Sequence, residues 1–230
     1  MLMKGLRMSH GESLIISKSK LNPKYREIFL SAKHFHEQPD YANFSSLTNW
    51  FDPDNPANEI DETVIKFLND EQYDYTDKQI EYWFQDMTPG RKLMAHCDYN
   101  HKVREFNPGD GGQWIHTVKK QDVMSPITIA CYLELDNMKG GDLVISEHTW
   151  FDEPEPLFFD EDVQSRVYSA PKHHFTPQVD DVVYFEGSKY YHWIEPLTQG
   201  RRKSMNINFW PRDYVIINTD INKKKIQPGT

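Results

Sequence analysis

Residues 200–210 read GRRKSMNINFW, and the alternation within them decides the fold class. Successive side chains of a β-strand point to opposite faces. One face of a strand at this position carries the polar residues Arg202, Ser204, Asn206 and Asn208, and the other carries Met205, Ile207 and Phe209. The pattern therefore predicts a strand whose polar face lines a pocket and whose apolar face packs outward under helices.

The chain from residue 80 onward contains further short runs of β-branched and aromatic residues, separated by Gly, Pro and Asp. The predicted strands are 80–87, 92–98, 126–135, 142–147, 166–170, 182–186 and 202–210. Short strands at this spacing predict a sandwich or barrel. Two long polar interruptions, 99–125 and 148–165, are interpreted as loops, and loops of that length in a compact domain usually serve a function.

The first 75 residues have a helical and irregular pattern. Asn22 followed by Pro23 is typical of a helix start. The apolar residues that then share one helical face are Tyr25, Ile28, Phe29 and Ala32. A second helix is indicated by the i, i+4, i+7, i+8 spacing of Ile60, Val64, Phe67 and Leu68.

The composition is that of one globular domain and argues against a nucleic acid as partner. Hydrophobic residues make up 38% of the 230 residues and charged residues 27%, which is ordinary for a folded soluble chain. Thirty-five acidic side chains against 26 basic ones leave a formal charge of −9. Because no basic block offsets this charge, a nucleic acid is disfavoured as partner.

The two cysteines, Cys97 and Cys131, are too few for a disulfide framework. The first residues do not resemble a secretion signal, and no apolar run approaches the roughly 20 residues that cross a bilayer. We therefore expect a soluble, cytoplasmic protein without a membrane partner.

Residues 95–100 read AHCDYN and place an imidazole, a thiol and a carboxylate in consecutive positions. Within a strand, His96 and Asp98 point to the same face, whereas Cys97 points to the other, where a free cysteine usually acts as a small buried hydrophobe. Taken alone, the His-x-Asp pair fits a surface strand with two polar residues as well as it fits a metal site.

A third candidate ligand, His192, lies in YYHWIEPLTQGRRKS, residues 190–204, ten positions before Arg202. Two imidazoles and one carboxylate on one triangular face of an octahedron leave three positions open. This arrangement is associated with iron(II) that binds a cosubstrate and dioxygen together. A zinc site would sooner close as a tetrahedron or keep one position open.

Three blocks follow one another in a distinctive order: PGRKLMAHCDYN, ITIACYLELDNMKGGDLVI and VDDVVYFEGSKYYHWIEPLTQGRRKSMNINFW. Together they resemble the Fe(II)/2-oxoglutarate-dependent dioxygenases, specifically the branch that includes the prolyl 4-hydroxylases. The resemblance runs from about residue 80 to residue 210, well over half of the chain. It implies that His96, Asp98 and His192 are the iron ligands.

The resemblance also implies contacts with 2-oxoglutarate. Arg202 falls at the position that holds the distal carboxylate, and a guanidinium suits this role because its planar fork matches a carboxylate and stays charged. Ser204 is the hydroxyl that often accompanies it, and the positions of Thr128 and Tyr132 contact the cosubstrate in that branch. Tyr132 is equally interpretable as a half-buried strand aromatic.

Two positions depart from the family pattern or leave a choice open. Met87 stands where many relatives carry an aromatic residue two positions before the Pro-Gly turn, which puts one cosubstrate contact in doubt. Arg201 could take the role of Arg202, although the Arg-x-Ser pattern favours Arg202. Gly140 and Gly141 fit a tight turn of the family, where the backbone is cramped or has a positive φ.

The expected fold is mainly β with flanking α-helices: a double-stranded β-helix, the jelly-roll or cupin-like form, with the N-terminal helices on one outer face. Residues 1–230 are expected to form one dioxygenase domain. Its parts would be a helical and irregular support at 1–75, the β core at 76–215 and a C-terminal tail at 216–230.

The resemblance implies a non-haem dioxygenase that uses Fe(II), 2-oxoglutarate and dioxygen, with ascorbate as an accessory reductant. It would release succinate and carbon dioxide and hydroxylate an unactivated C–H bond of a prolyl, peptidyl or small amino-acid-like substrate. Asp98 favours hydroxylation, because halogenating relatives carry a small residue at that position. The nucleic-acid demethylases usually carry a second arginine further along the last strand, where Asn206 and Asn208 stand here.

Two alternatives stay open: a jelly-roll module that binds a small ligand without turnover, and a small-metabolite oxygenase with another oxidative outcome. The remaining histidines are interpreted as structural or solvent-exposed: His34 and His36 at a helix end, His173 and His174 on opposite faces of a strand, and His101, His116 and His148 on loops. If the acidic run 152–162 folds over the pocket, it would favour a cationic or neutral substrate.

Overall fold

The computed structural model describes residues 17–32, 49–98, 105–106, 114–115, 127–152 and 161–212. The predicted tail 216–230 and most of the predicted loop 99–125 lie outside these ranges, and so do His34, His36, His101 and His116.

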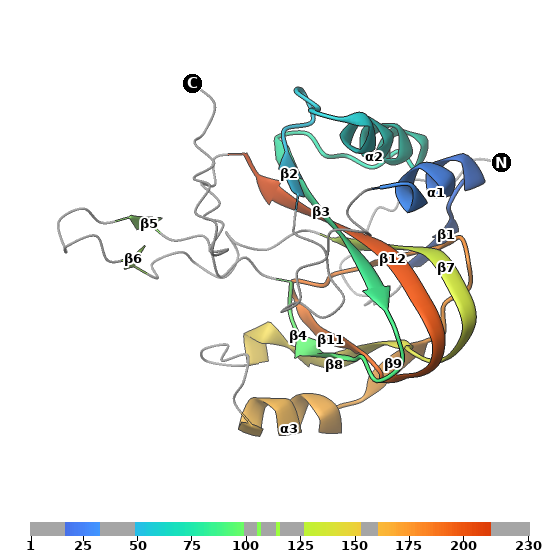
Figure 1. Ribbon diagram of the computed structural model, residues 1–230. Helices are drawn as coiled ribbons and strands as arrows, with labels where there is room; N and C mark the ends of the chain where they lie inside the picture. Colours follow the sequence, from blue (N-terminus) through green and yellow to red (C-terminus); the bar gives the residue numbers. More distant parts are fainter. Residues whose placement is uncertain are drawn as a thin grey trace.

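Two antiparallel sheets form the centre of the molecule (Figure 1). The six-stranded sheet has the order β1 (Ser17–Lys20), β10 (Asp181–Phe185), β7 (Thr128–Gly140), β12 (Leu197–Pro211), β3 (Lys78–Met87) and β2 (Asn49–Phe51). The four-stranded sheet has the order β4 (Leu93–His96), β11 (Tyr190–Ile194), β8 (Leu143–Thr149) and β9 (Lys172–Phe175). A separate pair joins β5 (Glu105–Phe106) and β6 (Trp114–Ile115).

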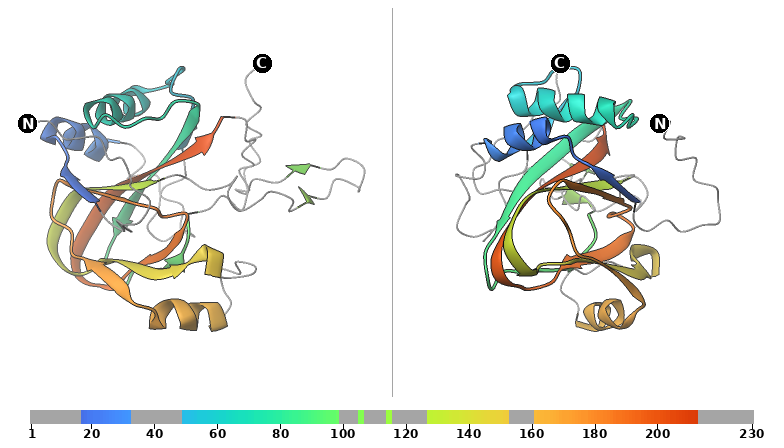
Figure 2. Two further views of the ribbon diagram at one scale, coloured as in Figure 1. Left: turned by 180° about the vertical axis from the view of Figure 1, so that it is seen from behind. Right: turned by 90° about the vertical axis from the view of Figure 1, so that its right-hand side faces the viewer.

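The long strands curve so that the two sheets face each other around a common interior, which is seen end-on in Figure 2. The side chains that fill this interior come from both sheets and include Ala130, Tyr132, Leu143, Ile145 and Phe185. The expected mainly β fold with a jelly-roll core is thereby confirmed.

Two helices cover the outer face of the six-stranded sheet, as expected (Figure 1). Helix α1 (Pro23–Leu30) begins at Asn22, whose side chain accepts a hydrogen bond from the Lys24 amide, and α2 (Glu59–Asp70) begins at Asn58 in the same way. The apolar faces of both helices pack on the outward side chains of β12, which are Met205, Ile207 and Phe209. The predicted alternation of β12 is therefore correct.

The outer face of the four-stranded sheet is covered by α3 (Glu161–Ser169), which follows the 3-10 turn Trp150–Asp152 after a segment outside the described residues. Val163 and Val167, one helical turn apart, pack there against Val144 and Trp193. The predicted strand 166–170 is thus wrong, because the β-branched residues form one helical stripe. The predicted loop 148–165 is likewise interrupted by the start of α3.

The N-terminal part also differs from its description as helical and irregular. Ser17–Lys20 pairs with β10, and Asn49–Phe51 pairs with β3. Both segments are short edge strands, whose signal in sequence is weak. Strand β11 was not predicted either: all five of its residues, YYHWI, are buried, so they show no polar alternation.

The turn that joins β7 to β8 requires glycine. Gly140 and Gly141 have φ values of 73° and 75°, and a Cβ on Gly140 would lie 2.2 Å from the carbonyl oxygen of Pro196. The interpretation of this pair as a cramped turn is confirmed. Within the described residues, no helix is both long and apolar enough to cross a membrane.

Candidate active site

Two neighbouring strands of the four-stranded sheet bring the two predicted histidines together. His96 ends β4 and His192 lies in the middle of β11, and the two residues are direct partners in the antiparallel ladder. Their ring centroids are 4.3 Å apart. The Phe185 ring packs edge-on against His192 with a centroid distance of 4.8 Å and fixes that imidazole from the barrel interior.

Asp98 follows β4 and is held by the turn between β10 and β11. Its amide donates a hydrogen bond to the Gly187 carbonyl at 2.8 Å, and the Ser188 hydroxyl donates to the Asp98 carbonyl. Gly187 has no substitute here, because a Cβ would lie 2.2 Å from Thr128 Oγ1 and 2.8 Å from Asp98 Oδ2. The absence of a side chain at residue 187 therefore makes room for the carboxylate.

The three side chains converge on one point. His96 Nε2 lies 3.5 Å from Asp98 Oδ1, and His192 Nε2 lies 3.5 Å from Asp98 Oδ2. One ligand atom from each residue lies within 4.8 Å of the others. Ligand atoms at about 2.1 Å from one ion in neighbouring octahedral positions are about 3 Å apart, so small rotations suffice to close this set on a metal.

Backbone carbonyls orient both imidazoles. His96 Nδ1 lies 2.8 Å from the Met94 carbonyl oxygen, and His192 Nδ1 lies 3.2 Å from that of Tyr190. The tautomer that donates these hydrogen bonds leaves the Nε2 lone pair facing Asp98. Such a bond from the far ring nitrogen is the usual support of a metal-binding histidine.

The protonation states of His192 and Asp98 suit metal binding. Burial lowers the pKa of His192 to about 4. The charge of Asp98 raises this pKa, but by less than burial lowers it. Burial likewise lowers the pKa of His96, but the hydrogen bond and charge of Asp98 leave it raised overall. Burial raises the pKa of Asp98, yet the two histidines and the Thr128 hydroxyl hold it well below its usual range. A neutral His192 and an ionised Asp98 are the forms that bind a metal.

Cys97 lies on the opposite side from this cluster, as predicted. Its side chain is buried among Ala95, Trp150 and Tyr191 on the face that α3 covers. Its thiol forms no disulfide and is no part of the candidate metal site.

Arg202 lies inside the barrel with 1% of its surface exposed. Its Nη1 donates to Ser204 Oγ at 3.0 Å and to Gln85 Oε1 at 3.3 Å, and it approaches Met87 Sδ at 3.6 Å. The guanidinium also lies over the Tyr132 ring, 4.8 Å from its centroid. Its Nε is buried without a hydrogen-bond partner, and among the described residues no carboxylate forms an ion pair with it.

Arg201 has a different environment from its neighbour. Its guanidinium forms a bidentate ion pair with Asp86, at 2.7 Å from Nε and 2.5 Å from Nη2, and 47% of its side chain is exposed. Because Arg201 already has a carboxylate partner and points away from the interior, Arg202 is the arginine available to an anionic ligand inside the barrel.

The remaining predicted residues lie beside either Arg202 or Asp98. Tyr132 is fully buried beside Arg202, and its hydroxyl makes no hydrogen bond within the described part of the chain. The Thr128 hydroxyl instead donates to Asp98 Oδ2 at 2.8 Å. Met87 is buried with Ile194 and Leu197 at the end of the barrel where Arg202 lies.

Gly187 and Ser188 were not predicted from the sequence, although an EGS turn between two buried strands signals that another segment approaches the backbone closely.

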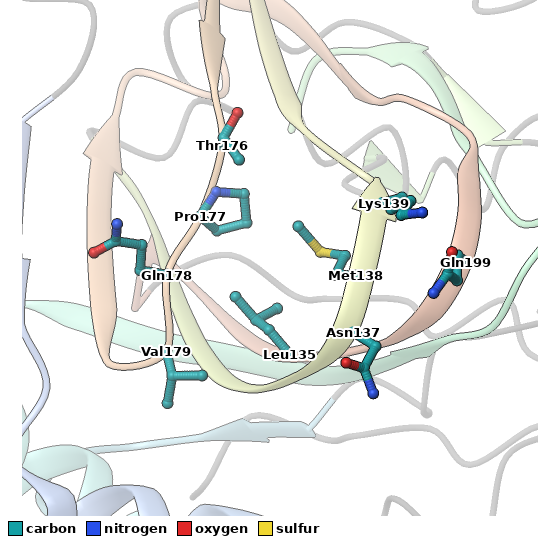
Figure 3. A pocket seen from close by; sticks show the side chains of 9 residues that line it. All are labelled: Leu135, Asn137, Met138, Lys139, Thr176, Pro177, Gln178, Val179 and Gln199. Carbon is teal, nitrogen blue, oxygen red and sulfur yellow. The ribbon is translucent and has the colours of Figure 1, made fainter.

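A pocket of about 480 Å³ opens at the C-terminal end of β7, the end away from Thr128 (Figure 3). Leu135 and Met138 point into it, and Pro177, Val179 and Gln199 lie around its rim. It begins seven residues beyond Thr128 along β7, which corresponds to about 23 Å of strand. None of the predicted site residues lines this pocket, so it is separate from the histidine and aspartate cluster.

The fold resembles those of several solved structures. The chain's fold is similar to that of a prolyl-4-hydroxylase from Pseudomonas putida, with 13% identity over 85% of this chain and 92% of the other and a TM-score of 0.50. A viral collagen prolyl hydroxylase from Paramecium bursaria Chlorella virus-1 aligns at 14% identity over 86% and 96%, with a TM-score of 0.47. HygX from Streptomyces hygroscopicus, solved with iron bound, aligns at 14% identity over 86% and 82%, with a TM-score of 0.48.

No curated protein matches the chain by sequence. The sequence profile of the 2OG-Fe(II) oxygenase superfamily, in contrast, matches residues 82–210, a span that includes both histidines, Asp98 and Arg202. The chain therefore belongs to the 2OG-Fe(II) oxygenase superfamily.

Proposed function

We propose that the protein is an iron(II)- and 2-oxoglutarate-dependent hydroxylase that acts on an unactivated C–H bond. His96, Asp98 and His192 would bind the iron, and Arg202 would bind the distal carboxylate of 2-oxoglutarate. The single observation that carries the proposal is that these groups lie in one barrel interior, with the three ligand atoms within 4.8 Å of one another.

The donor set fits iron(II). Two imidazole nitrogens and one carboxylate oxygen are ligands of intermediate hardness, and three protein ligands leave three coordination positions to small molecules. Both imidazoles are oriented by backbone carbonyls, and the carboxylate is oriented by Thr128, so the ligands are arranged before a metal binds. When bound, iron supplies the activation of dioxygen that is coupled to the oxidative decarboxylation of 2-oxoglutarate.

The environment of Arg202 supports the cosubstrate assignment. A buried guanidinium that has no carboxylate partner lowers the stability of the protein, and binding of a dicarboxylate supplies that partner. Ser204 and Gln85 fix one edge of the guanidinium, which leaves the Nε side for the ligand. The Tyr132 hydroxyl lies buried beside it, has no hydrogen-bond partner among the described residues, and is placed to donate a second hydrogen bond to the same carboxylate.

The chain's own residues contribute orientation and exclusion of water. Phe185 and Tyr132 supply apolar surface between the histidines and Arg202, so a diacid that spans the two would lie in a water-poor environment. The Asp98 carboxylate occupies the position of a third ligand, which favours transfer of a hydroxyl group over transfer of a halide. A prolyl, peptidyl or amino-acid-like substrate is in keeping with the fold shared with the prolyl-4-hydroxylase.

The experiment is a measurement of succinate released from 2-oxoglutarate by the purified protein with iron(II) and ascorbate. We expect release above the protein-free background, and its loss together with iron retention in His192→Ala. His173→Ala, an exposed histidine of β9 paired with Glu147, is the matched control and should behave as wild type. Iron retention in His192→Ala, or no succinate from the iron-loaded wild type, would favour a binding module without turnover.

A further inference from the structure

Two asparagines extend the inner face of β12 beyond Arg202 and Ser204. Asn206 and Asn208 alternate with Ile207 and Phe209, which pack on the opposite face under the helices. The asparagines therefore share the interior face with Arg202. They are almost fully buried, with 8% and 2% of their surfaces exposed.

Each of the two side-chain amides has one buried atom without a hydrogen-bond partner among the described residues. Asn206 Nδ2 and Asn208 Oδ1 are buried, and neither makes a hydrogen bond within the described part of the chain. Buried amides normally form hydrogen bonds. An amide that forms none lowers the stability of the protein unless a bound ligand supplies the missing partner. Two such residues at i and i+2 on an interior wall therefore indicate a binding surface.

The register of the six-stranded sheet places this surface next to the metal cluster. Asn206 is the ladder partner of Ala130 on β7. One position further along each strand, Asn208 lies across from Thr128, whose hydroxyl is bonded to Asp98. Ala130 contributes only a methyl group opposite Asn206.

Arg202 lies at the other end of the polar row on β12, four residues before Asn206 and six before Asn208. Measured along the strand, these separations correspond to about 13 Å and 20 Å. Because the distal carboxylate of the cosubstrate is assigned to Arg202, we assign the two asparagines to the substrate.

The neighbouring strands supply an aromatic wall. Across β3, Asn206 faces Trp83 and Asn208 faces Glu81. Trp210 donates a hydrogen bond from Nε1 to Glu81 Oε2 at 2.7 Å and packs against Trp50 with a centroid distance of 5.9 Å. The two amides thus lie in a largely apolar, aromatic surface, where hydrogen bonds to a ligand are strong because water does not compete.

We propose that Asn206 and Asn208 bind the backbone amides of an extended peptide substrate. This inference rests on the proposed function and narrows it from amino-acid-like substrates to peptides. Side chains at i and i+2 of a strand are about 7 Å apart, which equals the repeat of same-side amide groups in an extended peptide. Each asparagine amide has both a donor and an acceptor, so it matches the N–H and C=O groups of a peptide bond.

The test uses the zinc-substituted protein with 2-oxoglutarate, because zinc keeps the side-chain amide signals of ¹⁵N-labelled asparagines sharp in nuclear magnetic resonance spectra. The probe is N-acetyl-alanyl-prolyl-alanine amide at millimolar concentration. We expect it to shift the signals of Asn206 and Asn208, which are assigned by their absence in Asn206→Leu and Asn208→Leu. Free proline should leave both signals in place.

The variants separate binding from a structural role. Asn206→Leu and Asn208→Leu should weaken peptide binding about tenfold, the effect of one lost hydrogen bond. The melting temperature should not fall, because Asn206 Nδ2 and Asn208 Oδ1 make no hydrogen bond within the described part of the chain. Asn49→Leu is the matched control. Its Nδ2 is also buried without a partner, but Asn49 pairs with Tyr82 on the face toward the helices, so peptide binding should not change.

The proposal is overturned if the peptide shifts neither signal, if free proline shifts them equally, or if both leucine variants bind the peptide as wild type does. Calorimetric titration of the same samples with iron(II) and 2-oxoglutarate, without peptide, reports on the proposed function separately. Normal iron and cosubstrate binding with no peptide response would reject only the peptide assignment.

Discussion

His96 and His192 are direct cross-strand partners on β4 and β11, and their rings lie 4.3 Å apart. The pairing of two strands that are distant in the sequence thus creates the candidate metal site. A one-residue change in register between them would move one imidazole to the other face. The turn 186–189 then brings Asp98 to the same point through the hydrogen bond to the Gly187 carbonyl.

Thr128 is expected to act on iron through Asp98. Thr128→Val removes the hydroxyl that donates to Asp98 Oδ2 but keeps the shape of the side chain. Iron affinity should fall roughly 10-fold or more, the usual effect of removing a partner of a metal ligand. Thr128→Ser keeps the hydroxyl and should retain near wild-type affinity. Competition with a chromophoric chelator measures both, and equal affinities for the two variants would reject this role.

Gly187 is expected to tolerate no side chain. In Gly187→Ala the new methyl group would overlap Thr128 Oγ1, at 2.2 Å, and press on Asp98 Oδ2. Iron affinity should fall by about 10- to 100-fold as the carboxylate is displaced. Gly90→Ala is a useful comparison, because a Cβ at Gly90 meets nothing within 4 Å, even though the φ of Gly90 is positive, at 88°. If both substitutions affect iron equally, the argument from crowding is wrong.

The two adjacent arginines are expected to differ sharply. Arg202→Ala should weaken 2-oxoglutarate binding roughly 100-fold, because two charge-assisted hydrogen bonds are lost. Arg202→Lys should recover only part of this, since an ammonium lacks the planar fork. Arg201→Ala removes the partner of Asp86 instead and should leave cosubstrate affinity unchanged. The dissociation constant of 2-oxoglutarate in the presence of iron(II) measures all three, and a large effect of Arg201→Ala would reassign the anchor.

The helices are expected to stabilise the barrel without contributing to iron binding. Phe67 of α2 is 1% exposed and packs in the layer under β12. Phe67→Ala should lower the free energy of unfolding by about 3–5 kcal/mol, the usual cost of emptying a buried phenylalanine site. Chemical denaturation measures this loss, and iron affinity under native conditions should not change. A selective loss of iron with unchanged stability would contradict the division of roles.

Alternation along single strands made much of the interior predictable from sequence. The polar and apolar faces of residues 202–209, the opposite placement of Cys97 from His96, and the inward position of Thr128 and Tyr132 all follow from the period of two. The choice of Arg202 over Arg201 agrees with the deeper burial of Arg202. Its physical reason is the ion pair between Arg201 and Asp86, and because Asp86 lies on β3, the sequence around the arginines could not predict that pair.

Elements whose environment depends on distant segments were not predictable. Residues 166–169 have strand-forming side chains, yet Val163 and Val167 become one face of α3 because the outer surface of the four-stranded sheet needs a cover. β1 and β2 exist only because β10 and β3 offer open edges. The bond from Thr128 to Asp98 joins β7 to the segment after β4, and no local pattern reports such a contact.

The most direct test of the account is a crystal structure of the protein grown without oxygen in the presence of iron(II) and 2-oxoglutarate. The account predicts one iron bound by His96 Nε2, His192 Nε2 and an oxygen of Asp98, with the distal carboxylate of 2-oxoglutarate on the Arg202 guanidinium. Iron bound elsewhere, or a cosubstrate whose distal carboxylate contacts Arg201 and leaves Arg202 unpaired, would contradict it.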